Sequence, residues 1–303
     1  MPAWTRSWRV LGSREAGPTV ATIFVCLTRA TKYTASLRML RTFFAALALA
    51  AVLPAPAARA DLADVVQRGS LRVLVMIDTR RPEFFTLDES SPGFDREVLQ
   101  GFARLHHVKL EPVPVAGWDA LIPALVEGRG DLIGGRFTVT ESRKKLVAFT
   151  AEVFPTRNVV MTRHPHRVVN TVEELRAEKV GTIKGTSMAE AIAAAAVPPA
   201  RVDDGIPAGG FAEALKSGRI TAAVWGVESA IAAQRGDPDI RLGMFLGPPS
   251  SLAYAVRKAD TALLAALNEY IANLRRTPTW SRLVVRYFGA DAIEVLKKAR
   301  ERN

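Results

Sequence analysis

The stretch of the chain with the clearest capacity for chemistry is residues 136–143, RFTVTESR. It follows GDLIGG, whose apolar residues and glycines predict a buried strand that ends in a loop. The guanidinium group of Arg143 can present a planar pair of N–H donors to both oxygens of a carboxylate. Thr138 can donate to the same anion, and Thr140 can cap a following helix. The stretch therefore predicts either a capped turn or the anion-binding edge of a ligand cleft.

A second group of possible anion donors lies in the segment KGTS. Gly185, Thr186 and Ser187 precede an alanine-rich stretch that predicts a helix. The first N–H groups of a helix have no partner within the helix, and the helix dipole favours a negative charge there. The segment is therefore either a plain capped turn or a second set of donors for an anion.

The segments that must position these residues alternate between strand and helix patterns. Short apolar or alternating runs predict strands at 71–77, 109–115 and 131–135. Apolar residues near helical spacing predict helices at 93–108 and 118–128. This β-α-β-α-β order predicts a doubly wound α/β sheet.

A second module with the same alternation follows residue 163. Thr171, with Glu174 three residues later, predicts a capping box at the start of a helix over 171–178. The other predicted elements are strands at 179–183, 220–226 and 251–258 and helices at 188–196, 209–218, 259–276 and 278–289. Two α/β modules are therefore expected.

The formal net charge of +11 over 303 residues could suggest a nucleic-acid-binding protein. The charge is unevenly distributed, however. Residues 1–60 hold eight Lys and Arg residues and one acidic residue, Glu15, for a net of +7, which leaves +4 for the rest. Such a surplus is ordinary for a soluble protein, so no nucleic-acid partner is expected.

Residues 39–60, MLRTFFAALALAAVLPAPAARA, have the pattern of a secretory signal peptide. A basic start precedes an apolar run of eleven residues, Phe43–Leu53, which is too short to cross a bilayer. Ala58-Arg59-Ala60 fits the cleavage pattern, so cleavage is expected after Ala60 and the mature protein is expected in the periplasm. Because signal peptides begin at the start of translation, residues 1–38 are expected to be a mis-annotated extension before a start at Met39.

The sequence suggests no metal or cofactor. The single cysteine, Cys26, precedes the expected cleavage site, so the mature chain is expected to lack disulfides, zinc thiolates and a cysteine nucleophile. His106 and His107 fall on a predicted helix, and His164 and His166 are expected at the surface. These pairs are therefore weak candidates for metal ligands.

Seven motifs occur in a fixed order along the chain: GSLRVLV, GFDREVLQGFA, WDALIPALVEGRGDLIGGRFTVTESRKKLVAFT, VGTIKGTSMAE, ALKSGRITAAV, YAVRKAD and VVRYFG. Each motif is weak alone, but together they cover the chain from about Ser70 to Gly289. In this order they resemble the extracellular solute-binding proteins of polar amino-acid ABC transporters, family 3, which include the glutamine- and histidine-binding proteins.

The resemblance implies the two-lobed α/β fold of type II periplasmic binding proteins, with two doubly wound sheets. Lobe 1 would comprise 61–154 and 251–303, and lobe 2 would comprise 158–247. Hinge segments are expected at about 153–157 and 248–252. A ligand would lie between the lobes, at the carboxyl ends of the strands, and the lobes would close around it.

The resemblance also implies roles for single residues at an anion site. Arg143 matches the arginine that binds the ligand α-carboxylate in this family, and Thr138 matches a donor to the same group. The turn that contains Thr186 and Ser187 matches a turn of the second lobe that faces this carboxylate. Both lobes would then grip one anion, which would couple binding to closure.

Two further positions match the walls of the family's pocket. Asp78, after the first strand, matches an acidic position that lines the pocket of glutamine-binding proteins. Trp118 matches an aromatic position that covers the ligand side chain, although core packing at a helix start would explain it almost as well.

The chain departs from the family pattern where an aspartate normally binds the ligand ammonium. The family has D-A-x-x-x-D after G-R-x, whereas this chain has GRITAAVWG, with Gly226 at the last position. A buried ammonium without a carboxylate partner is costly. Either Asp78 or Glu228 supplies the charge, or the ligand has no α-ammonium. Trp225, beside the gap, could fill it or stack on a ligand.

Arg136 is a second departure, because the family usually has a small residue there. Its side chain either enters the cleft and adds positive charge or turns outward and leaves only its backbone in the site. Together the departures favour a small carboxylate-bearing metabolite, such as an organic acid or an atypical amino acid, over a standard amino acid.

The sequence thus predicts a monomeric periplasmic binding protein, without enzyme activity, that delivers its ligand to an ABC permease at the inner membrane. One alternative is a periplasmic enzyme of the same fold, like the cyclohexadienyl and arogenate dehydratases. Glu228 and Lys184 could then serve as the acid and the cation. Another alternative is a binding protein that serves a sensor or a periplasmic oxidation system.

Overall fold

The computed structural model describes residues 61–77, 83–207, 209–289 and 292–300. The predicted extension 1–38, the predicted signal peptide 39–60 and Asp78 lie outside the described residues. No helix in the described part of the chain is long and apolar enough to cross a membrane.

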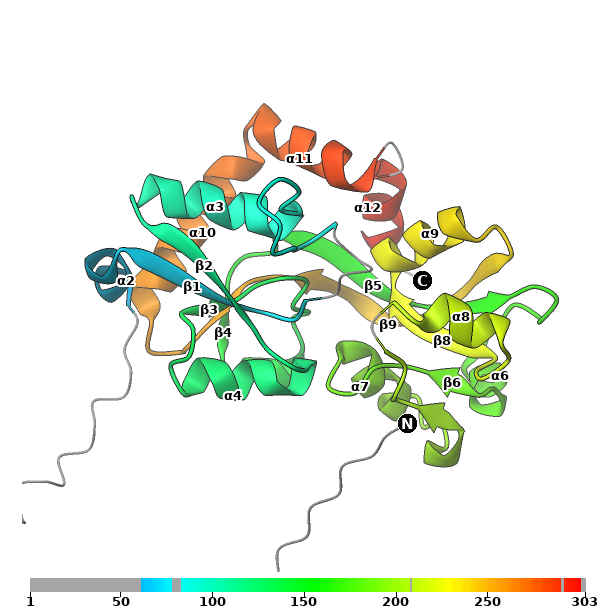
Figure 1. Ribbon diagram of the computed structural model, residues 1–303. Helices are drawn as coiled ribbons and strands as arrows, with labels where there is room; N and C mark the ends of the chain where they lie inside the picture. Colours follow the sequence, from blue (N-terminus) through cyan, green and yellow to red (C-terminus); the bar gives the residue numbers. More distant parts are fainter. Residues whose placement is uncertain (1–60, 78–82, 208, 290–291, 301–303) are drawn as a thin grey trace, which may run out of the picture. The chain divides into compact units, whose positions relative to one another are not determined.

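The first sheet contains the predicted β-α-β-α-β unit (Figure 1). Its strand order is β2-β1-β3-β10-β4, in which β1 pairs in parallel with β2 and β3, and β10 is antiparallel to β3 and β4. The strands are β1 (Ser70–Val75), β2 (Lys109–Pro114), β3 (Leu132–Ile133), β4 (Ala148–Phe149) and β10 (Ala255–Val256). The helices of this part are α2 (Leu62–Arg68), α3 (Phe94–Leu105), η1 (Trp118–Ala120), α4 (Leu121–Val126), α5 (Glu141–Lys144), α10 (Thr261–Arg275) and α11 (Pro278–Phe288).

The second sheet has the order β7-β6-β8-β5-β9, with a parallel part and an antiparallel part. Its strands are β5 (Phe154–Arg163), β6 (Val180–Gly181), β7 (Val202–Asp203), β8 (Ala222–Gly226) and β9 (Ile240–Leu252). The accompanying helices are α6 (Val172–Ala177), α7 (Ser187–Ala194), η2 (Pro199–Arg201), α8 (Phe211–Lys216) and α9 (Val227–Gly236), and α12 (Ala292–Arg300) packs against β5 and α9. Two α/β sheets confirm the predicted fold class.

The two segments expected as hinges belong to β5 and β9. These strands are antiparallel, and Phe154, Pro155 and Thr156 pair with Leu252, Ser251 and Ser250 in the same order. The sequence patterns do not predict the strand at 154–163. The chain therefore passes between the two sheets twice, through the paired ends of β5 and β9. That these paired segments act as a hinge stays a prediction.

The single strand predicted over 251–258 was wrong. β9 ends at Leu252, and β10 comprises only Ala255 and Val256. Between them, the Ala253 N–H donates to the Phe137 carbonyl (3.0 Å) and the Tyr254 N–H donates to Thr150 Oγ1 (3.1 Å). The chain leaves the second sheet here because its backbone groups find partners in loops of the first.

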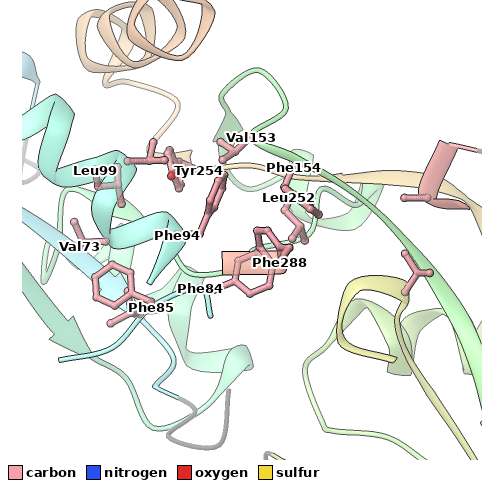
Figure 2. Packing of buried hydrophobic residues seen from close by; sticks show 14 of the residues in the cluster. Val73, Phe84, Phe85, Phe94, Leu99, Val153, Phe154, Leu252, Tyr254 and Phe288 are labelled. Carbon is pink, nitrogen blue, oxygen red and sulfur yellow. The ribbon is translucent and has the colours of Figure 1, made fainter. Parts of the chain in front are cut away.

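An aromatic cluster fixes the segment before α3 against β5 and α11 (Figure 2). The ring centroids of Phe94 and Phe154 lie 5.8 Å apart, and those of Phe154 and Phe288 lie 4.6 Å apart. The Phe84 ring meets Phe154 edge to face at 6.1 Å. Such pairs each add about 0.5–1.5 kcal/mol beyond the burial of their area. The cluster therefore holds Phe84 firmly beside the site described below.

Candidate ligand-binding cleft

A cavity lies among residues contributed by elements of both sheets. Its volume is about 40 Å³, which admits a few water molecules. A larger ligand could enter only if lining side chains withdrew or the walls moved apart. The lining residues are Trp118, Arg136, Thr138, Arg143, Thr156, Asn158, Ile183, Thr186, Ser187, Met188, Trp225, Gly226, Glu228 and Leu252.

Eight of the nine residues predicted for the site line this cavity, and the ninth, Asp78, lies outside the described residues. Two polar lining residues, Thr156 and Asn158, were not predicted; both belong to β5. Side chains two residues apart in a strand share one face. That spacing is the signal that could have identified them, had the strand been predicted.

Arg143 is a buried cation that connects two walls of the cavity. Thr140 caps α5 as predicted, because its Oγ1 accepts the Arg143 N–H (3.3 Å). The guanidinium donates from Nη1 to the Thr138 carbonyl (2.8 Å) and from Nη2 to the Gly185 carbonyl (2.9 Å). It also lies 4.1 Å from the centroid of the Phe137 ring. Two of its five N–H donors are thus used by these carbonyls, and the others can serve a ligand.

The charge of Arg143 persists despite its burial. Desolvation lowers the pKa of its guanidinium to about 10, against the opposing effect of nearby Glu190. At neutral pH the group is therefore still cationic. A buried cation of this kind favours an anion beside it.

The turn before α7 brings a helix N-terminus to the same cavity. Thr186 is the N-cap of α7: its hydroxyl accepts the Ala189 N–H (3.3 Å) and donates to the Ile183 carbonyl (2.6 Å). The Thr186 hydroxyl is thus committed to the turn, so the donors for a ligand are the first N–H groups of the helix, at Ser187 and Met188.

Gly185 allows this turn to approach η1 closely. Its φ is +75°, and a Cβ there would lie 2.7 Å from the Asp119 backbone nitrogen. A glycine is therefore required both by the left-handed backbone and by the contact. A hydrogen bond from Ser142 Oγ to Glu190 Oε2 (3.0 Å) also joins α5 to α7.

Arg136 is one of the residues that line the cavity, and its guanidinium contacts Ser229 and Phe84, which are not among them. Its Nη1 donates to Ser229 Oγ (3.1 Å). Its guanidinium carbon lies 5.5 Å from the Phe84 ring centroid and 5.9 Å from that of Trp118. Arg136 has φ +67°, and its backbone N–H donates to Asp95 Oδ2 (2.9 Å). The Asp95 carboxylate thus fixes the backbone at Arg136 by a hydrogen bond.

Asp95 was not predicted as part of the site, although it lies in the GFDREVLQGFA motif. It is 4% exposed, and its Oδ1 accepts a hydrogen bond from the Tyr254 hydroxyl (3.1 Å). Burial raises the pKa of the Asp95 carboxyl to about 6, whereas its hydrogen bonds from Arg136 and Tyr254 act in the opposite direction.

The raised pKa of Asp95 predicts a specific dependence of stability on pH. The carboxyl has an ordinary pKa of 3.8, so between this value and about 6 the folded protein binds more protons than the unfolded chain. Stability should therefore fall as pH rises through this interval, by on the order of 2–3 kcal/mol from this one group. Urea unfolding of the wild type and Asp95→Asn at about pH 4 and about pH 7 isolates the effect. The variant should gain stability relative to the wild type at the higher pH, and a constant difference would contradict the assignment.

Glu228 occupies the space in which the side chain of residue 226 would lie. A Cβ on Gly226 would overlap with Glu228 Oε1 and lie 2.8 Å from Oε2. The Glu228 carboxylate is buried and accepts a hydrogen bond from Thr156 Oγ1 (2.7 Å). A carboxylate is thus present where the resemblance led us to expect an aspartate side chain, but the carboxylate comes from two residues further along the chain.

The two tryptophans have different environments. Trp225 is 3% exposed and packs edge to face on Phe211, with centroids 4.2 Å apart, so it is mainly a core residue with one side at the cavity. Trp118 is half-buried at the start of η1.

Lys184 is not among the cavity-lining residues. No group of three or more potential metal-ligating side chains occurs in the described ranges.

Comparisons with known proteins show that this chain is similar to solute-binding proteins. Residues 71–290 match the bacterial extracellular solute-binding proteins, family 3. A probable histidine-binding protein of Neisseria gonorrhoeae is 25% identical over 214 residues, which are 68% of this chain and 78% of that protein. The membrane-bound lytic murein transglycosylase F of Desulfosudis oleivorans is 26% identical over 241 residues, which are 75% of this chain. The chain spans only 51% of the length of that transglycosylase.

Solved structures agree with the same grouping. An ancestral arginine-binding protein bound to arginine has a TM-score of 0.63 and 27% identity, covering 73% of this chain and 99% of the other. The ancestral amino acid-binding protein AncCDT-1, a precursor of cyclohexadienyl dehydratase, has a TM-score of 0.65 and 26% identity, covering 75% and 99%.

Proposed function

This chain belongs to the bacterial extracellular solute-binding proteins, family 3, and we propose on that basis that it captures a small carboxylate-bearing metabolite in its cleft. The exported protein acts in the periplasm and delivers the ligand to an ABC permease. The observation that carries the proposal is Arg143, a buried cation that faces the N-terminus of α7 across one cavity.

Binding to this site would join the two walls of the cavity. Arg143 already bonds to the carbonyl of Gly185, in the turn before α7, and Ser142 bonds to Glu190 within α7. A carboxylate held by Arg143 and by the first N–H groups of α7 would add charge-assisted hydrogen bonds from both sides. These bonds give the ligand a higher affinity for the closed arrangement, which is the requirement for ligand-driven closure.

Glu228 changes the ligand that the sequence alone favoured. The sequence favours an organic acid or an atypical amino acid, because Gly226 replaces the expected aspartate, and it leaves open whether Asp78 or Glu228 supplies the missing charge. Since the Glu228 carboxylate fills that space, we propose that it accepts the ammonium of an α-amino acid. The ligand is then an amino acid, held by its carboxylate at Arg143 and by its ammonium at Glu228.

An enzyme of the same fold is the second candidate, because AncCDT-1 is described as a precursor of cyclohexadienyl dehydratase. Among the described residues that line the cavity, Glu228 is the one carboxyl group, and Thr156 already donates to it. Lys184, the cation considered for such chemistry, is not among these residues. Binding therefore fits the cavity better. Product formation from prephenate or arogenate at an enzymatic rate would overturn this choice.

A thermal-shift screen of amino acids and organic acids tests the proposal. A ligand stabilises the folded state by RT ln(1 + [L]/Kd), which is about 2.7 kcal/mol at a hundredfold excess over Kd. At least one carboxylate ligand should raise the unfolding temperature, and deletion of the gene should abolish its uptake by cells. Failure of every carboxylate in the screen would refute the proposed function.

A further inference from the structure

Two polar side chains of β5 lie on the same wall of the cavity as Glu228. Thr156 and Asn158 both line the cavity, and they are two residues apart in one strand, so their side chains share a face of the sheet. Asn158 pairs with Gly226 across the antiparallel β5–β8 ladder, and residues that pair in this way have side chains on the same face. Since the Glu228 carboxylate fills the space beside Gly226, the three polar groups gather at this wall.

The hydroxyl of Thr156 faces a ligand as an acceptor. Its single hydrogen is donated to Glu228 Oε2 at 2.7 Å, and both residues are buried. A hydroxyl has one hydrogen and two acceptor lone pairs, so Thr156 Oγ1 retains acceptor capacity once its hydrogen is used. The amide oxygen of Asn158 can accept as well. The wall therefore presents acceptors from three side chains, one of which carries a negative charge.

A primary ammonium group is the partner that matches three acceptors. It carries three N–H donors and a positive charge that the Glu228 carboxylate would balance. A secondary ammonium has one N–H fewer, because a carbon atom replaces one hydrogen. Such a group would bring that carbon against a polar atom of the wall and leave the atom without a hydrogen bond, which is unfavourable in a buried site.

We propose that Thr156 and Asn158 complete an ammonium site around Glu228 and make the cleft selective for ligands with a primary α-amino group. This inference rests on the proposed function, because it concerns the amino end of the same ligand. It assigns two residues of β5 as specificity determinants, and it excludes N-methylated amino acids and cyclic imino acids. Arg143 and the first N–H groups of α7 bind the carboxylate, so separate residues recognise the two ends of the ligand.

Calorimetric titration with glutamate, glutamine, histidine and arginine tests the proposal, each beside its Nα-methyl form and its analogue without the amino group. Any of these amino acids that the wild type binds should bind about tenfold more tightly than its Nα-methyl form, because one hydrogen bond to a charged group is lost. Thr156→Val removes an acceptor at nearly constant volume and gives the methyl group an apolar neighbour. It should weaken binding of the parent amino acid about tenfold and nearly abolish its preference over the Nα-methyl form. Asn158→Ala should act in the same direction.

Two control variants separate this role from a structural one. Thr156→Ser retains the hydroxyl and should retain the preference for the primary amine. Thr162→Val makes the same exchange in the same strand, at a buried residue that is not among the lining residues, so it should leave binding unchanged. The analogue without the amino group should bind to Thr156→Val as tightly as to the wild type, because it has no N–H to lose.

The possible failures can be distinguished. If an amino acid and its Nα-methyl form bind equally well, or if Thr156→Val or Asn158→Ala leaves the preference intact, the assignment is wrong although the proposed function stands. The same holds if only carboxylates without an amino group bind. If Thr156→Val weakens the analogue without the amino group as much as the amino acid, Thr156 merely supports the fold of the site and the assignment is again wrong. If the wild type binds none of these compounds and no other carboxylate, the proposed function fails too.

Discussion

Replacement of Arg143 by alanine is expected to weaken binding of the carboxylate ligand by roughly 100-fold or more. Arg143 is 6% exposed, so a carboxylate beside its side chain would be largely removed from water. Without the cation, the ligand carboxylate would remain buried with only neutral donors around it. A buried charge that has lost its partner is costly in free energy, so binding should weaken. Calorimetric titration of Arg143→Ala with the tightest ligand of the screen measures the effect.

The side chain of Arg143 also supports the site, and the control must separate the two roles. It bonds to the carbonyls of Thr138 and Gly185, so the alanine variant also loses a link between the cavity walls. Arg143→Lys retains a positive charge but cannot bond in a planar fork to all these partners. It should recover only a small part of the affinity. An alanine variant that binds as tightly as the wild type and unfolds at the same temperature would contradict the carboxylate site.

Replacement of Glu228 by alanine is expected to lower the affinity for an α-amino acid by roughly 100-fold relative to the affinity for the same molecule without its amino group, for example glutamate and glutarate. The two ligands differ in the α-amino group, which we assign to the Glu228 carboxylate. Glutarate has no ammonium, so it loses no partner and is relieved of a nearby negative charge. The ratio of the two dissociation constants therefore reports on the ammonium contact alone.

A second substitution can restore the lost carboxylate. In the Glu228→Ala background the space beside Gly226 is no longer filled by the Glu228 side chain, so Gly226→Asp can place a carboxylate there. The backbone of Gly226, with φ −66° and ψ 139°, accepts any residue. The double variant should recover much of the preference for glutamate. If Glu228→Ala leaves that preference unchanged, the ammonium is held elsewhere and this part of the account is wrong.

The sequence predicted the parts of the site that are continuous along the chain. Thr138 and Arg143 fall within one motif, and Thr186 and Ser187 fall in one turn before a helix, so local patterns were sufficient. The two sheets were likewise predictable from the alternation of strand and helix patterns. The ladder between β5 and β9 was not, because its paired residues are 77 (Arg163 and Ile240) to 98 (Phe154 and Leu252) positions apart in sequence and β5 was not recognised.

Three features required the three-dimensional arrangement. The Glu228 carboxylate overlaps with the space that a side chain at position 226 would fill, and this proximity cannot be read from the sequence. The position of the Arg136 side chain depends on its left-handed backbone, which no residue pattern indicates for an arginine. The Asp95 carboxylate accepts a hydrogen bond from the backbone N–H of Arg136, and nothing in the motif that contains Asp95 predicts this contact.

The most direct test of the account is calorimetric titration of the wild type with matched pairs of ligands that differ in the α-carboxylate. Suitable pairs are glutamate with 4-aminobutyrate, glutamine with 4-aminobutanamide, histidine with histamine and arginine with agmatine. Any amino acid that binds is expected to lose affinity by roughly 100-fold or more when this carboxylate is absent, and Arg143→Ala is expected to remove the difference within the pair. A decarboxylated ligand that binds the wild type as tightly as its parent would contradict it.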